Sequence, residues 1–572
     1  MWGLFLTVLP ADLTPDAPLL LEGASVYVSA EAPPQKASVL IRDGRIEFVG
    51  DPSQARLLAP QASVLDLKGG FLFPGWADAH GHLLGLGKAL ETADLRGAPS
   101  AAEAVRRMAE IAGKLPPGSW AEGRGWDQNR WSGEAFPDAH DLDAVLAGRP
   151  AVARRVDGHA VWVNSAALAA AGIGAGTRDP EGGRIVRRPD GSPSGVLIDN
   201  AMALIEKAMP PPSPADFERR VLAAARACAR VGLTEVQDAS SYAPAEISTL
   251  ERLAREELLP IRVYATVSPG ESYEQRLAEP PPSAQEGSLA RLFARGPRVR
   301  KGRDFLTVRA IKAYADGALG SRGAALLRDY SDDPGNRGLL VTSPSRLQEI
   351  AREARQNGWQ VWIHAIGDRG NRLALDAYAA AEKSVPVAAP GGDRPRIEHA
   401  QVVAPEDIAR FASLGVIASI QPTHATSDMA WAELRLGPER VRGAYAWRQI
   451  RSAGARMAGG SDFPVESENP LFGFYAAVTR QDREGQPSGG WRPQERLTRR
   501  EALALFTSDA AYAAFEEGRR GRIAPGYEAD VTVFGGDPMA VPERDIPPIR
   551  VALTLVGGRV AYRPGPSGEA TR

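Results

Sequence analysis

Short apolar runs alternate with longer helical stretches through the middle of the chain. Each apolar run has the length of a buried strand, and the stretches between them have the spacing of helices. This alternation predicts parallel βα units and, because eight strands are counted, a (β/α)₈ barrel. The strands are expected to end at residues 80–82, 236–238, 264–267, 311–314, 362–364, 397–399, 418–421 and 460–462, with helices at 244–257, 345–357, 371–384, 405–414 and 498–515.

Both ends of the chain carry β-rich segments of a different style. Residues 18–67 alternate short β-rich runs with turns, and Arg42-Asp43-Gly44-Arg45 is typical of a hairpin turn. Further strands are expected at 529–534, 551–556 and 559–562. Neither end has enough strands for a stable sheet alone, so we expect one small β-domain assembled from both. The expected division is 1–70 and 521–565 for this domain, 71–520 for the barrel, and 566–572 for a disordered tail.

A long segment, residues 95–220, interrupts the βα rhythm. It is rich in glycine, proline and tryptophan, and residues 123–131 read Gly-Arg-Gly-Trp-Asp-Gln-Asn-Arg-Trp. We expect an insertion after the first strand that lies over the barrel mouth as a substrate-binding cap.

Composition and charge narrow the function classes. The 572 residues suffice for one large barrel with accessory segments or for two to three domains. The net charge of -2 offers no basic field for nucleic acid or a membrane surface, and no apolar stretch is long enough to span a bilayer. The single cysteine, Cys228, forms no intrachain disulfide and is expected to be a buried, inert thiol. The compartment is therefore not fixed by cysteine usage.

The first ten residues are apolar but lack the positive start of a secretory signal. The sequence favours the cytoplasm and leaves export by an atypical N-terminal signal open. The partner expected is a small-molecule substrate, and a homodimer is the candidate assembly.

His80 and His82 carry the first chemical signal. They follow the apolar run of residues 71–76, and two positions one residue apart on a strand share one side. Both imidazoles can therefore reach one metal ion. The alternative is a pair of hydrogen-bonded histidines near the surface.

Four more candidate ligands lie on later strands. Lys312 lies in the fourth strand, and His364, His399 and Asp462 lie at the ends of the fifth, sixth and eighth. Parallel barrel strands bring such positions to one end of the barrel axis. Nitrogen and oxygen donors suit Zn²⁺ or a similar divalent metal. Six are too many for one tetrahedral zinc with an open position and suit two metals that share a bridge. One metal per chain is the alternative expectation.

Lys312 and Asp462 each allow more than one interpretation. Two dications would repel a cationic lysine, whereas burial lowers the pKa of lysine and exposes a nucleophilic amine. Reaction with carbon dioxide would give a bridging carbamate; the alternative is an unmodified lysine paired with Asp316 or another carboxylate. Asp462 is a candidate metal ligand and proton carrier, or else part of a turn with a helix cap or of a glycine-lined phosphate site.

Taken in order, the motifs resemble those of the amidohydrolase superfamily, specifically the family-3 amidohydrolases that include N-substituted formamide deformylase-like and YtcJ-like proteins. The resemblance covers nearly the whole chain. Besides the HxH strand it rests on residues 311–322 (IKAYADGALGSR), 364–368 (HAIGD), 396–400 (RIEHA), 421–428 (QPTHATSD), 460–465 (GSDFPV) and 526–530 (GYEAD).

The resemblance implies a distorted TIM-like barrel beside a composite β-sandwich, with a binuclear metal centre. It implies one metal held by His80, His82 and Asp462, a second held by His364 and His399, and carbamylated Lys312 as the bridge.

Five further residues are candidate substrate contacts. His159 and His424 match family-like segments and suit substrate or oxyanion contacts, or else are hydrogen-bonded structural histidines. Trp126, Tyr314 and Arg322 are candidates for shaping the pocket, with core packing or ion pairing as the alternative.

The function expected is hydrolysis of a non-peptide carbon–nitrogen bond, in an amide, N-formyl or N-acyl substrate, by a metal-bound hydroxide. The metals would polarise the carbonyl, and Asp462 would pass a proton to the leaving amine. The alternatives are a metal-dependent isomerase or lyase on the same scaffold and a non-catalytic binding protein.

Overall fold

The computed structural model describes residues 18–128, 131–132, 135–146, 148–155, 160–180, 183–199, 201–270, 276, 279–280, 288–320, 322–386 and 392–565. The chain divides into two compact units, one of residues 1–83 with 224–572 and one of residues 84–223. The second unit takes in the insertion expected at 95–220, and its place over the barrel mouth stays a prediction. The expected tail, 566–572, lies outside the described residues.

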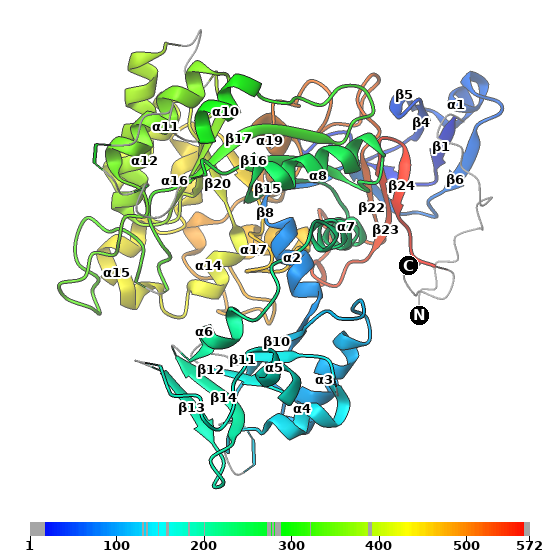
Figure 1. Ribbon diagram of the computed structural model, residues 1–572. Coiled ribbons are helices and arrows are strands. Elements are labelled where there is room, and N and C mark those ends of the chain that lie inside the picture. The colour runs from blue at the N-terminus through cyan, green and yellow to red at the C-terminus, as the bar shows by residue number, and fades with distance from the viewer. Residues whose placement is uncertain are drawn as a thin grey trace. The chain divides into compact units, whose positions relative to one another are not determined.

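The first unit is built on eight parallel strands in consecutive order, which confirms the (β/α)₈ barrel (Figure 1). Their interior positions alternate with positions that face the surrounding helices, as the pleat requires. The strands are β8 (Trp76–Gly81), β15 (Leu233–Tyr242), β16 (Arg262–Val267), β17 (Leu306–Tyr314), β18 (Gln360–Ala365), β19 (Arg396–His399), β20 (Ile417–Ile420) and β21 (Met457–Gly459).

Helices follow the barrel strands in the order that βα units require. They are α7 (Pro214–Arg230), α8 (Pro244–Arg255), α10 (Ser288–Arg295), α11 (Pro344–Gln356), α12 (Asp368–Ser384), α13 (Pro405–Ser413), α14 (Pro422–Asp428), α15 (Ala432–Arg440), α16 (Trp447–Ser452), α17 (Pro470–Thr479), α18 (Arg499–Leu505) and α19 (Ser508–Ala513).

The helix expected at 498–515 is two helices, α18 and α19. The chain breaks between them because Phe506 turns toward β8. Its carbonyl accepts the Ala77 N–H at 2.7 Å, and its ring stacks on Trp76 with the centroids 5.7 Å apart. Thr507 then has non-helical dihedral angles before α19 begins. Tertiary contacts therefore override the helical pattern at this point.

The first and last barrel strands are joined by side chains rather than by a regular ladder. The Asp78 carboxylate accepts the backbone N–H of His80 at 2.9 Å and the Ser461 hydroxyl at 2.6 Å. The Asp462 N–H then donates to the His80 carbonyl at 2.7 Å. The eighth strand thus ends at Gly459, and residues 460–462 continue as a turn that is fixed to β8.

Two sheets pack beside the barrel. One is formed by N-terminal strands alone, and the other combines strands from both ends of the chain. Strand β7 pairs with β22 in antiparallel register, so N-terminal and C-terminal segments share one sheet. The two sheets face each other across a common apolar core that includes Leu21, Val39, Val531 and Leu555. The elements are β1 (Leu19–Glu22), β2 (Ser25–Val26), β3 (Gln35–Lys36), β4 (Ser38–Arg42), β5 (Arg45–Gly50), α1 (Pro52–Leu58), β6 (Ser63–Asp66), β7 (Phe71–Pro74), β22 (Val531–Phe534), β23 (Val551–Val556) and β24 (Arg559–Tyr562).

The second unit, residues 84–223, is a six-stranded mixed sheet with helices, in the strand order β13-β14-β12-β11-β10-β9. Trp126, Trp131 and Trp162 form the centre of one of its apolar clusters. Besides the ends of α7 and α2 (Leu83–Leu90), its elements are β9 (Thr92–Asp94), α3 (Ala101–Ala112), β10 (Ala121–Trp126), α4 (Ala139–Leu146), β11 (Ala151–Arg155), β12 (Ala160–Val163), α5 (Ser165–Ala170), β13 (Gly183–Arg187), β14 (Pro193–Asp199) and α6 (Met202–Glu206).

Within the described part of the chain, no helix is both long and apolar enough to cross a membrane.

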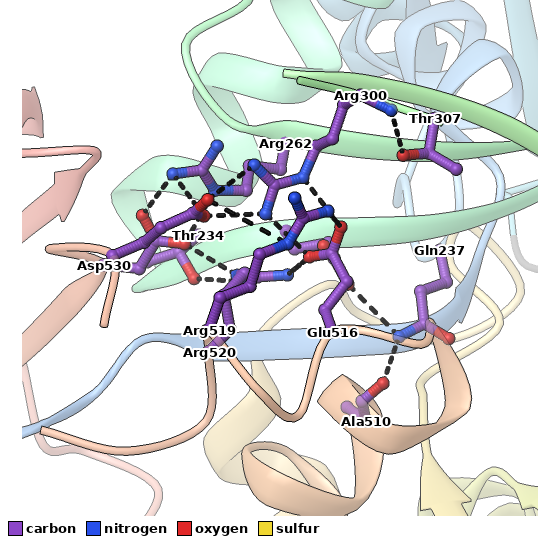
Figure 2. Close-up of polar contacts among 12 residues, drawn as sticks. Thr234, Gln237, Arg262, Arg300, Thr307, Ala510, Glu516, Arg519, Arg520 and Asp530 are labelled. Atoms are coloured by element: carbon purple, nitrogen blue, oxygen red, sulfur yellow. Dashed lines mark hydrogen bonds and ion pairs between the residues drawn. The ribbon is translucent and has the colours of Figure 1, made fainter. Parts of the chain in front are cut away.

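A buried network of arginines and carboxylates links the barrel to the C-terminal segment of the β-sandwich (Figure 2). Arg300 donates to Glu516 and Glu528 at 2.6–2.9 Å, and its side chain is 1% exposed. Arg262 and Arg520 both donate to Asp530, each from Nε at 2.7 Å. Burial alone would raise the pKa of the Asp530 carboxyl, but the two guanidinium groups outweigh it and lower that pKa.

We expect Arg300→Leu to destabilise the protein by about 3–5 kcal/mol, because two buried carboxylates lose a partner. Arg42→Leu is the matched control: Arg42 pairs with Glu47 at 2.6 Å, but both side chains are more than a third exposed, so its loss should cost about 0–1 kcal/mol. Thermal melting of both purified variants measures the difference. Equal melting temperatures would contradict a stabilising role for the network.

Candidate active site

The six candidate ligands all lie at the C-terminal ends of barrel strands in the first unit. Each sits where its strand leaves the barrel, so side chains from distant sequence positions meet. Four are almost fully buried: His80, Lys312, His399 and Asp462, at 1%, 1%, 6% and 7% exposure. The side chain of His82 is the most exposed of the six, at 27%. The site therefore reaches solvent beside His82.

The Asp462 carboxylate lies among three imidazoles. One oxygen is 2.9 Å from His82 Nε2 and 3.4 Å from His80 Nε2. The other is 3.6 Å from His424 Nε2. Donor atoms of His80, His399 and Asp462 all lie within 4.8 Å of one another. Burial would raise the pKa of the Asp462 carboxyl, but the neighbouring imidazoles of His80 and His82 outweigh it and hold that pKa well below its usual value.

His364 and His399 form the opposite side of the site. Their ring centroids are 4.6 Å apart, and the ring of His399 is 5.0 Å from that of His80. Burial lowers the pKa of His364 to about 3 and that of His399 well below its usual value. Both imidazoles are thus neutral at physiological pH, which is the form that binds metals.

Lys312 lies inside this ring of histidines without an acidic partner. Within the described ranges, no carboxylate oxygen lies within 4.0 Å of Nζ, and the nearest recorded aromatic contact is the Tyr314 ring at 5.1 Å. Burial lowers the pKa of Lys312 to about 8. The expected alternative, a pair with Asp316, is not formed.

The Asp316 carboxylate serves the backbone instead. It accepts the N–H groups of Ala325, Ile366 and Gly367 at 2.8–2.9 Å. Burial nevertheless raises the pKa of Asp316 to about 7. These bonds fix the loop after β17 to the end of β18, next to His364, whose Nε2 lies 3.7 Å from Asp316 Oδ1.

Three of the candidate metal-binding histidines also have a hydrogen-bond partner on the side of the ring away from the site. Glu398 contacts Nδ1 of His80, Gln421 lies 2.7 Å from Nδ1 of His399, and the Gly317 backbone hydrogen-bonds to His364. Such partners fix the tautomer and the direction of a metal-binding histidine.

Nε2 of His80 and Nε2 of His364 are buried and have no hydrogen-bond partner among the described residues. Buried polar atoms without partners are rare in folded proteins. These orphaned nitrogens, beside an ionised carboxylate, fit a divalent cation.

Two of the candidate ligands have left-handed backbone conformations. The φ angles of His399 and Asp462 are +75° and +60°, a region that residues other than glycine seldom adopt. Each such residue costs about 1–3 kcal/mol and persists where the surrounding structure enforces it. The strain turns both side chains toward the barrel axis at the points where β19 and β21 end.

Comparison with known proteins identifies the family. Residues 63–562 match the model of the amidohydrolase family. The chain belongs to this family. It is 34% identical to the Bacillus subtilis protein YtcJ over 94% of this chain and 98% of that protein.

Two further relatives agree with the family assignment. N-substituted formamide deformylase of Arthrobacter pascens is 27% identical over 92% of this chain and 94% of its own. The crystal structure of an uncharacterized metal-dependent hydrolase from Pyrococcus horikoshii is similar with a TM-score of 0.73 and 27% identity, over 92% of this chain and 99% of that one. Family membership indicates a hydrolase.

Two of the five candidate substrate contacts lie beside this amidohydrolase site. The ring of Tyr314 is 5.6 Å from that of His364, and the ring of His424 stacks on that of His399 at 5.8 Å.

The other three candidates differ from these two. Arg322 pairs with Asp332 at 2.9 Å. Trp126 is fully buried in the core of the second unit, where its indole N–H donates to the Ala153 carbonyl at 2.8 Å. His159 lies outside the described residues.

Sequence reasoning missed the residues that orient the ligands. Arg396 and Glu398 occupy alternate interior positions of β19, and Asp78 lies two positions before His80 on β8. Burial would raise the pKa of Glu398, but Arg396 and His80 lower it strongly, so the carboxylate is ionised. The available signal was the placement of charged residues at inward positions of strands that are otherwise apolar.

We expect Glu398→Gln to lower metal affinity by about 10–100-fold, because the amide no longer supplies a charged partner for His80 Nδ1. Titration of chelator-treated protein with Zn²⁺ measures this. Glu495→Gln is the control, since Glu495 is equally buried but bonds only to Arg448 and Gln449. Unchanged affinity in Glu398→Gln would contradict the orienting role.

Proposed function

We propose that this protein is a metal-dependent amidohydrolase that cleaves a non-peptide carbon–nitrogen bond in a small amide, N-formyl or N-acyl substrate. The observation that carries this proposal is the Asp462 carboxylate among His80, His82 and His424, next to buried imidazole nitrogens that lack partners. Family membership and the names of the relatives support hydrolysis as the reaction class.

In this proposal His80, His82 and Asp462 would hold one divalent metal, zinc being the first candidate, and His364 and His399 would hold a second. When bound, such metals lower the pKa of a coordinated water to about 7 and polarise a substrate carbonyl. The neutral imidazoles and the ionised carboxylate match this donor set.

Lys312 would carry the bridge as a carbamate. Its neutral amine attacks carbon dioxide, forms a carbon–nitrogen bond and releases one proton, which leaves an anion with two oxygens. The buried amine, with its pKa lowered to about 8 and no carboxylate partner, supports this chemistry. A protonated Lys312 would instead repel any cation held by the histidines.

Asp462 would move the proton. Its ionised carboxylate accepts a proton from the attacking water and gives it to the nitrogen of the leaving amine as the carbon–nitrogen bond breaks. His424, 3.6 Å from the second oxygen of Asp462, and Tyr314 lie where they would contact the substrate.

The reaction class is tested with metal-loaded protein and a panel of N-formyl and N-acyl amines in ¹⁸O-labelled water. Hydrolysis must place one solvent oxygen in the acid product, and mass spectrometry of the product detects it. Turnover without solvent oxygen would indicate an isomerase or lyase. Plasma mass spectrometry of the same protein is expected to find about two metals per chain; one metal per chain would remove Lys312 from its bridging role.

For a substrate found in that panel, Asp462→Asn should lower kcat by about 10²–10⁴-fold, because the amide cannot accept the proton. Metal content is expected to stay nearly unchanged, since the amide oxygen can still reach the metal. Asp537→Asn is the control, because Asp537 is equally buried but accepts the Tyr27 hydroxyl in the β-sandwich. Full activity in Asp462→Asn would exclude the proton-carrying role.

A further inference from the structure

A second cavity lies outside the candidate active site, between α12 and the loop that follows β17. Its volume is about 390 Å³, which is within the range of small-molecule sites. None of the six candidate metal ligands lines it. The lining residues are Leu326, Leu327, Arg337, Arg369, Arg372, Leu373 and Asp376.

Three arginines lie on the rim of the cavity, and two of them are paired with carboxylates. Arg337 uses Nε for Asp329 at 2.6 Å, and Arg372 uses Nε and Nη2 for Asp407 and Glu406. For Arg369, no described carboxylate lies within 4.0 Å of the guanidinium group. Arginine binds carboxylates through paired N–H groups, so this rim is suited to an organic anion.

The one acidic residue among those that line the cavity already has an arginine partner. Asp376 accepts Arg410 Nη2 at 2.6 Å, outside the set of lining residues. It therefore does not cancel the positive charge of Arg369.

Leucines line the rest of the cavity. Leu326 is fully buried, whereas Leu327 and Leu373 are half-buried. A fully polar anion such as phosphate would leave this apolar surface without a partner, whereas an aliphatic or aromatic group would cover it.

The apolar side of the cavity is fixed rather than loose. The Leu326 N–H donates to the Arg337 carbonyl at 2.9 Å, and the Leu327 N–H donates to Asp368 at 2.8 Å. The preceding residue, Ala325, donates to Asp316, whose carboxylate lies beside His364. An occupant that contacts Leu327 would therefore lie two residues along the chain from Ala325, which is bonded to the carboxylate beside His364.

We propose that this cavity binds a small organic carboxylate with an apolar tail, the carboxylate on Arg369 and the tail on Leu327 and Leu373. The site is separate from the candidate metal centre, and its occupancy does not depend on the proposed reaction.

Isothermal titration of metal-loaded protein with hexanoate tests the proposal, with acetate and 1-hexanol as matched probes. Hexanoate is expected to bind at least about tenfold more tightly than either, because acetate lacks the tail and hexanol lacks the charge. Arg369→Gln should weaken hexanoate binding about tenfold. Leu373→Trp should weaken it too, by filling the cavity.

Arg500→Gln is the control. Arg500 is the second residue of α18, as Arg369 is the second residue of α12, and both side chains are exposed. If carboxylates bound only at the metals, acetate would bind as tightly as hexanoate, and Arg369→Gln would not weaken the binding of either. That result overturns the proposal, as does equal binding of hexanol and hexanoate or no binding of hexanoate.

Discussion

The closure of the barrel between β8 and β21 is the constraint on which the site depends. Asp78 performs this closure by accepting N–H and hydroxyl groups from both sides of the seam. Gly460 permits it, because a Cβ at that position would lie 2.4 Å from the backbone nitrogen of His80. Only a glycine allows so close an approach of two backbones. The seam in turn sets the distance between the histidines of the first strand and Asp462.

A buried guanidinium group, that of Arg396, connects the barrel strands beneath the candidate ligands. Arg396 is fully buried and donates to Glu398, Gln237 and Ser419, and to the Ala79 carbonyl. One guanidinium group thereby connects β19 with β8, β15 and β20. Removing one member of such a cluster leaves a buried charge without compensation, so the cluster behaves as a unit. This cluster reaches the candidate active site through the contact between Glu398 and His80.

Fold and ligands were accessible from the sequence to different degrees. The eight strands could be predicted because each is a short apolar run, and the convergence of the candidate ligands could be predicted because parallel strands end at one face. The break between α18 and α19 could not, since it depends on Phe506 packing against Trp76.

The roles of Asp78, Glu398 and Gln421 were also hidden. Each of them forms hydrogen bonds to a residue that is close in the folded barrel, and the sequence alone does not show these contacts. The internal order of residues 84–223 was missed for another reason: their glycines and prolines indicate loops, whereas six strands pair there through long-range contacts.

The two ends of the barrel strands carry different kinds of polar cluster, and this explains why both can be buried. At the N-terminal ends, Arg262, Arg300 and Arg520 are each paired with buried carboxylates. At the C-terminal ends, Nε2 of His80 and Nε2 of His364 have no hydrogen-bond partner among the described residues, and the Lys312 amine contacts the Tyr314 ring rather than a carboxylate. A cluster of paired opposite charges serves mainly the stability of the fold, whereas neutral imidazoles without hydrogen-bond partners retain the capacity to bind. A substitution in the network should therefore be detected by melting, and one at the candidate ligands by metal binding.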